Sequence, residues 1–320
     1  DGIWRRLLAG ARARGELPAE LDERYAWQVL LGRDRTINAF ALPGGYFGLH
    51  LGLVGAVATR DELASVLAHE MSHITQRHIP RLLGQQSRQA PWMIAAMVLG
   101  AIAASKNPQA GAALAVGGQA AVIQQQLNFS RDMEREADRI GYGIMTQAGY
   151  APQGFVGMFE KLQAASRIND NGDWPYLRSH PLTTQRIADM QQRQQGLLRP
   201  DAPAAPRAPA ASAPTPGASP ELPETVVRAS RPAPAPDLEA LLIAARARVL
   251  GRPGVDVLRA WAGEHAQPGF GAQPLPRRAA ALYAAALAEA QLRDLPKAEA
   301  LAAQLATLVA GDVPAAQQAR

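Results

Sequence analysis

One short stretch, residues 67–75, constrains this chain more than any other part of its sequence. It contains His69, Glu70 and His73 in the spacing H-E-x-x-H. Side chains four residues apart lie on the same face of an α-helix, so both imidazoles can reach one metal ion. Glu70 lies beside them, where it can act on the attacking water. This arrangement is typical of the zinc site of a metallopeptidase.

The motif lies in a segment that predicts a helix on independent grounds. Thr59 and Glu62 have the spacing of a capping box, apolar residues recur along one face, and Pro80 marks the expected end. We therefore expect a helix that is buried on one side. An alternative is a surface helix that merely displays two histidines, and a third metal ligand elsewhere in the chain would argue against it.

A second helix can supply that ligand. Glu134 and Asp138 are four residues apart in the segment after Ser130, which is a favourable N-cap residue. Glu134 is the candidate for the carboxylate ligand of a two-histidine, one-glutamate zinc site, and Asp138 can orient a ligating imidazole from behind. A solvated acidic face paired with neighbouring arginines is an equally good interpretation of this run.

Composition limits the other possibilities. The chain has no cysteine, so a metal must be held by histidine and carboxylate side chains. Its net charge is +5, but the arginines are dispersed and no nucleic-acid motif is present, which argues against a nucleic-acid partner. Because the sequence begins at Asp1, we expect that a signal peptide has been removed, although a trimmed sequence would look the same.

Two further regions bear on substrate and membrane contact. Residues 36–42 and 46–51 predict a β-hairpin after a helical region at 3–31. Its first strand is a candidate edge for pairing with a substrate, although an ordinary core hairpin would look the same. Residues 91–104 and 110–123 are apolar, but each run is too short to span a bilayer. They predict a helical hairpin that packs on the protein, lies at a membrane interface or forms a mobile lid.

Three segments together resemble one superfamily of proteases. They are residues 38–45 (Asn-Ala-Phe-Ala-Leu-Pro-Gly-Gly), the motif at 69–73, and the Ser-Arg-x-x-Glu-x-x-Ala-Asp run at 130–138. The chain is similar over about residues 1–195 to the HtpX-type and CAAX-prenyl-protease-type zinc metallopeptidases. Within them it most resembles the soluble periplasmic, BepA-like branch, in which tetratricopeptide repeats follow the protease domain. The resemblance implies one Zn²⁺ per chain, with Glu134 rather than Glu136 as its third ligand.

The resemblance extends to a His-Pro-x-x-x-x-Arg segment that contains His180 and Arg186. It implies that His180 can occupy the open position of the zinc ion as a removable ligand and keep the enzyme latent. It also implies that Arg186 lies near the catalytic centre, where it is a candidate for stabilising the oxyanion. Without the resemblance, His180 and Pro181 would simply begin a helix.

The chain divides into three parts by composition. We expect a metallopeptidase domain at 1–198, a linker rich in proline and alanine at 199–236, and a helical module at 237–320. Residues 282–298 look like a degenerate tetratricopeptide repeat, although an alanine-rich helical hairpin explains them nearly as well. The expected fold is mainly α with a small β-sheet.

The predicted function is that of a periplasmic zinc metalloendopeptidase for misfolded or stalled outer-membrane proteins. The outer-membrane assembly machinery and a membrane surface, reached through residues 91–123, are its expected partners. The alternative is a chaperone or scaffold-like assembly factor that acts mainly through the helical module with little proteolysis. A basic nucleic-acid-binding protein is a third hypothesis, against which the three-ligand pattern argues.

Overall fold

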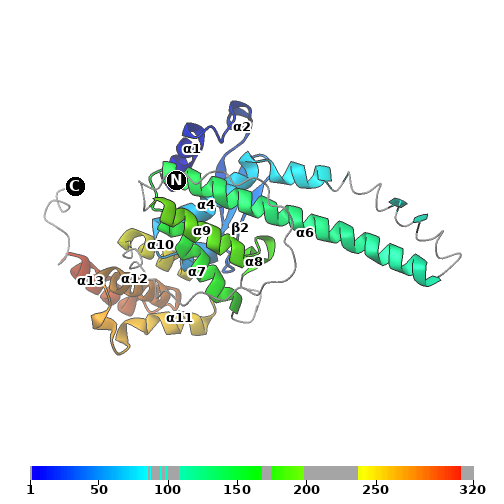
Figure 1. Ribbon diagram of the computed structural model, residues 1–320. Helices are drawn as coiled ribbons and strands as arrows, with labels where there is room; N and C mark the ends of the chain where they lie inside the picture. Colours follow the sequence, from blue (N-terminus) through cyan, green and yellow to red (C-terminus); the bar gives the residue numbers. More distant parts are fainter. Residues whose placement is uncertain are drawn as a thin grey trace, which may run out of the picture.

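The computed structural model describes residues 2–85, 108–167, 174–197 and 237–310, with a few helical positions between 87 and 99. It confirms a mainly helical fold with one small sheet (Figure 1). The strands are β1 (Gln28–Gly32), β2 (Ala39–Leu42) and β3 (Tyr46–His50). The helices are α1 (Gly2–Ala13), α2 (Ala19–Arg24), α3 (Leu51–Ala56), α4 (Arg60–Thr75), α6 (Pro108–Gln147), α7 (Gln153–Arg167), α8 (Pro175–Ser179), α9 (Thr184–Leu197), α10 (Leu238–Leu250), α11 (Val255–Ala262), α12 (Leu275–Gln291) and α13 (Leu295–Ala310).

The sheet has the order β1-β3-β2, so β2 is an edge strand. β2 and β3 form the predicted antiparallel hairpin, with Ala39 opposite Leu49 and Leu42 opposite Tyr46. Gly44 and Gly45 make its turn at φ values of 86° and 81°, which glycine adopts without strain. β2 also contacts α4, so the sheet places an edge strand beside the helix that carries the H-E-x-x-H motif.

The expectation of a helical region over 3–31 is wrong for its last part. α1 ends at Ala13, α2 ends at Arg24, and residues 28–32 form β1, which pairs in parallel with β3. Two residues interrupt the helical pattern: Gly15 has a positive φ of 70°, and Pro18 is the N-cap residue of α2. Pairing with β3 satisfies the backbone of residues 28–32, so tertiary structure overrides their helix-like spacing.

α4 begins as predicted, because the Thr59 side chain accepts a hydrogen bond from the Glu62 amide at 3.1 Å. The helix is buried almost all round, not on one side only, since α1, α6, α7 and β2 all contact it. It ends at Thr75, before the predicted stop at Pro80. Arg77 turns the chain at a φ of 54°, and a new helical stretch begins at His78.

α6 is one continuous 40-residue helix that runs out beyond the rest of the fold (Figure 1). Ser130 lies in its interior, so the prediction that Ser130 caps a helix is wrong. The helix continues without a break from the second apolar run, residues 110–123, into the segment that carries Glu134. Most of the first apolar run, residues 91–104, lies outside the described residues. In the described part of the chain, no helix is both long and apolar enough to cross a bilayer.

α6 and α4 approach closely because Gly141 lies at their contact. A Cβ at this position would lie 3.0 Å from the backbone of Ala68 and His69. This is tighter than side-chain packing ordinarily allows, so the glycine lets two backbones approach each other. The close approach brings the acidic residues of α6 up to the histidines of α4.

The C-terminal helices pack on the metallopeptidase part through α10 and α3. Arg60 also contacts Asp237 and Glu239 across this junction. α12 and α13 form the predicted helical hairpin, with its turn at residues 292–294. Its identity as a tetratricopeptide repeat stays a prediction, as do the domain boundaries, because the 199–236 linker lies outside the described residues.

Candidate metal centre

Four predicted ligands converge on one buried point. His69 and His73 come from α4, Glu134 from α6, and His180 from the end of α8; one donor atom of each lies within 4.8 Å of all the others. His73 is partly buried and the other three are buried. The structure therefore joins segments that are up to 111 residues apart in the sequence.

The donor set fits a zinc ion. The Nε2 atoms of His69 and His73 lie 3.1 Å apart. Glu134 places Oε2 at 3.4 Å from the first and Oε1 at 3.5 Å from the second. Two imidazole nitrogens and a carboxylate that face a common point are the protein ligands of many catalytic zinc sites.

Asp138 contacts His69 at the ring nitrogen opposite the one that would bind the metal. Its Oδ1 lies 3.0 Å from His69 Nδ1, although the contact lacks the alignment of a full hydrogen bond. A carboxylate on Nδ1 favours the tautomer that leaves Nε2 free as a donor to a metal. Burial opposes a charge on His69, but its contacts with Asp138 and Glu134 outweigh burial and raise its pKa to about 10 in the metal-free protein.

His180 closes the cluster on its remaining side. Its Nδ1 lies 3.1 and 3.2 Å from the two carboxylate oxygens of Glu134, and its Nε2 lies 3.4 Å from Glu70 Oε1. The His180 amide donates to the Tyr176 carbonyl at 2.8 Å, and the two rings lie 4.6 Å apart. His180 is thus held by α8 in the place where a fourth ligand would lie.

Glu70 points into the same space. It is 2 % exposed, and its Oε1 has no hydrogen-bond partner among the described residues. Burial raises the pKa of this carboxyl above its ordinary value. A buried carboxylate with a raised pKa and a free oxygen is suited to accept a proton from water.

Arg186 lies behind the ligands and binds several groups at once. Its Nε and Nη2 donate to Asp138 at 2.6 and 2.7 Å, and its Nη1 lies 2.8 Å from the Pro181 carbonyl and 3.0 Å from Glu134 Oε2. All three of its nitrogens therefore have partners in this structure. These contacts tie Asp138, Glu134 and the loop after His180 together.

His78 and Glu136 form a second supporting pair that sequence reasoning missed. His78 Nδ1 lies 2.9 Å from His73 Nδ1, and His78 Nε2 lies 3.2 Å from Glu136 Oε2. Arg81 donates to the same Glu136 oxygen at 2.7 Å. Helical spacing gave no signal for this pair, because the turn at Arg77 is what carries His78 back beneath His73.

Comparison with known proteins agrees with this geometry. The family model described as Peptidase family M48 matches residues 8–194. The Beta-barrel assembly-enhancing protease of Escherichia coli K12 is 38 % identical over 157 residues, which are 49 % of this chain and 32 % of that protein. The protein of the same name from Yersinia pestis is 38 % identical over 170 residues, 53 % of this chain and 35 % of that protein.

A more distant relative is mitochondrial. The Mitochondrial metalloendopeptidase OMA1 of Saccharomyces cerevisiae is 27 % identical over 195 residues, 59 % of this chain and 53 % of that protein. The chain thus spans about a third to a half of the length of these relatives.

Proposed function

The chain belongs to peptidase family M48, and on that premise we propose that it is a zinc-dependent metalloendopeptidase that acts on proteins of the bacterial envelope. One observation carries the proposal: the donor atoms of His69, His73 and Glu134 converge, and Glu70 Oε1, which accepts no hydrogen bond among the described residues, lies 3.4 Å from His180 in the same cluster.

In the proposed mechanism, His69, His73 and Glu134 would hold one Zn²⁺, which would supply Lewis acidity when bound. Glu70 takes a proton from the attacking water and passes it to the leaving amine. Asp138 fixes the orientation of His69. Arg186 holds Asp138 and Glu134 in place and is the candidate for stabilising the oxyanion once the loop at His180 moves.

The relatives support the choice of substrate. Two of them are named for β-barrel assembly, so we propose that the substrates are misfolded or stalled outer-membrane proteins in the periplasm. An unfolded chain can add to the edge of β2, which lies beside α4. Ile94, Val98, Leu99 and Val116 are exposed apolar residues of the 91–123 region and support a peripheral membrane contact.

We further propose that the enzyme is latent. His180 adds a fourth protein donor to the site and lies 3.4 Å from the catalytic carboxylate. Zinc sites with four protein ligands are usually structural, whereas catalytic sites keep one position open. Removal of the His180 imidazole should therefore open the site.

The test compares zinc content and casein cleavage in four proteins: the wild type, Glu70→Gln, His180→Ala and a control, His265→Ala, from the C-terminal helices. We expect about one zinc per chain in each. Cleavage should disappear in Glu70→Gln, rise in His180→Ala and stay at the wild-type level in His265→Ala. A Glu70→Gln protein that still cleaves, or a wild type that binds no zinc, would remove the proposed mechanism.

The closed site favours one second candidate. If His180 occupied the fourth zinc position permanently, the protein would act as a chaperone or scaffold-like assembly factor. Its helical module would then do the binding. That module exposes Ile243, Val255 and Leu295. The same experiment separates the two functions, because His180→Ala gains no activity if the site is only structural.

A further inference from the structure

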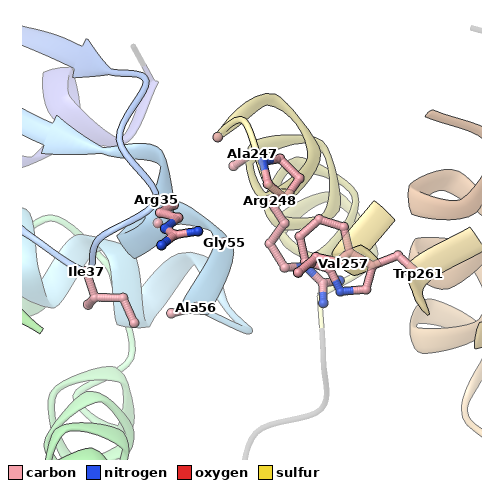
Figure 2. A pocket seen from close by; sticks show the side chains of 11 residues that line it. Arg35, Ile37, Gly55, Ala56, Ala247, Arg248, Val257 and Trp261 are labelled. Carbon is pink, nitrogen blue, oxygen red and sulfur yellow. The ribbon is translucent and has the colours of Figure 1, made fainter. Parts of the chain in front are cut away.

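A cavity of about 300 Å³ lies apart from the metal centre, between the metallopeptidase part and the C-terminal helices. Arg35, Ile37 and Ala56 line one side, and Arg248, Val257 and Trp261 line the other (Figure 2). Its size is at the lower end of the range for ligand pockets, ~300–1,000 Å³, which suits one side chain and its terminal group. None of the metal-site residues borders it.

The charged side chains that line this cavity are all positive. Arg35 and Arg248 contribute guanidinium groups, and no aspartate or glutamate is among the described residues that line the space. Within the part of the chain that the structure describes, neither arginine forms an ion pair, and the buried Nε of Arg248 has no hydrogen-bond partner. The two guanidinium groups call for an anionic partner, and guanidinium groups match carboxylates in geometry.

The rest of the lining is apolar or small. Trp261 lies under the Arg248 guanidinium, with 5.7 Å from its ring centroid to the Arg248 Cζ. Gly55 leaves room for this arrangement, because a Cβ there would lie 2.5 Å from Arg248 Cγ. The cavity therefore suits a ligand that has both a negative group and an apolar group.

The cavity also adjoins the edge strand. Ile37, two residues before β2, lines it and accepts a hydrogen bond from the Tyr176 amide at 3.2 Å. A peptide that pairs antiparallel with β2 runs from Leu42 toward Ala39, so its carboxyl end leads toward Ile37. This direction selects the carboxyl end of a polypeptide over other anions.

We propose that this cavity binds the carboxyl-terminal residue of a polypeptide, with its carboxylate facing Arg35 and Arg248 and its side chain against Val257 and Trp261. The pocket's own chemistry supports the binding. The choice of a polypeptide's carboxyl end, which comes from the direction of a strand along β2, and the further step that this polypeptide is a substrate both rest on the proposed function.

The test measures peptide binding without cleavage. The zinc-loaded Glu70→Gln protein is titrated, by fluorescence anisotropy, against a labelled eight-residue peptide of serine, threonine and glycine that ends in valine–leucine. A second peptide of the same sequence carries a terminal amide. We expect the free acid to bind at least about tenfold more tightly than the amide, because the amide loses the charge-assisted hydrogen bonds.

Variants locate the binding in the cavity. Arg35→Gln, at an exposed residue, and the Arg35→Gln/Arg248→Gln pair should each reduce the difference between acid and amide, and the pair should abolish it. Arg246→Gln removes the same charge from the exposed face of α10 and should leave the difference intact. Equal binding of acid and amide, or an equal loss in Arg246→Gln, would overturn the proposal. Displacement of the peptide by millimolar inorganic phosphate would also overturn it, because the cavity would then be a general anion site.

Discussion

Arg186 and Arg12 allow a direct measurement of what burial adds to an ion pair. Each donates from Nε and Nη2 to one aspartate, at 2.6 and 2.7 Å in both pairs. The side chains of Arg186 and Asp138 are 4 % and 2 % exposed, whereas those of Arg12 and Asp22 are 50 % and 25 % exposed. The two arginine–aspartate contacts therefore share chemistry and geometry and differ in their access to water, and Arg186 in addition contacts Glu134 and the Pro181 carbonyl.

Replacement of each arginine by methionine keeps a long unbranched side chain and removes the charge. Arg186→Met leaves the buried Asp138 carboxylate with His69 as its remaining charged partner and also removes the contact with Glu134, and breaking a buried ion pair costs about 3–5 kcal/mol. Arg12→Met leaves a carboxylate that water can reach, which costs at most about 1 kcal/mol. With about 2–4 °C of Tm per kcal/mol for a domain of this size, we expect losses of about 6–20 °C and of at most about 4 °C.

Thermal unfolding of the zinc-free proteins, followed by circular dichroism at pH 7, measures both losses without a contribution from metal binding. If Arg186→Met does not fold, the Asp138→Asn/Arg186→Met protein should recover a folded state, because it removes the orphaned charge. Equal Tm losses in Arg186→Met and Arg12→Met would refute the reasoning, since burial would then add nothing.

Two further predictions concern groups outside the first ligands. His78→Gln and Glu136→Gln should each weaken zinc binding about 10–100-fold in a chelator competition, because His73 loses its support. Arg81→Gln, which changes the more exposed arginine that binds Glu136, should alter zinc binding little. Burial raises the pKa of Tyr142 to about 12, and its hydroxyl has no hydrogen-bond partner among the described residues. The raised pKa means that the neutral phenol stabilises the fold fully below the unfolded pKa of about 10 and that this contribution is lost as the pH rises toward 12. Tyr142→Phe should therefore lose less stability than the wild type between pH 9 and 11 in urea titrations, and the exposed-site control Tyr46→Phe should behave like the wild type.

The sequence was sufficient to place the candidate ligands of each helix on one face, because helical spacing decides this locally. His69 and His73 share a face of α4 whatever the rest of the chain does, and Glu134 and Asp138 share a face of α6. The hairpin of β2 and β3 was also predictable from the sequence, because Pro43-Gly-Gly45 strongly favours a turn. Each of these features depends on a few neighbouring residues.

The features that sequence reasoning missed depend on distant partners. Residues 28–32 have helix-compatible spacing and become a strand only because β3 offers backbone hydrogen bonds. Ser130 has the chemistry of a cap, yet it lies inside α6 because helical residues precede it. The pairing of His78 with His73 requires the positive φ of Arg77, which no periodicity reveals.

The length of α6 makes the metal centre sensitive to forces applied far from it. α6 carries Val116 on its outer part and Glu134 at the candidate metal site, and its Gly141 packs directly against the backbone of α4. A tilt of about 5° around that contact would move Glu134, ~10 Å away at 1.5 Å per residue, by roughly 0.9 Å. Metal–ligand distances tolerate only about ±0.2 Å. A partner that binds the outer part of α6 could therefore move the candidate ligand Glu134 without contacting the site itself.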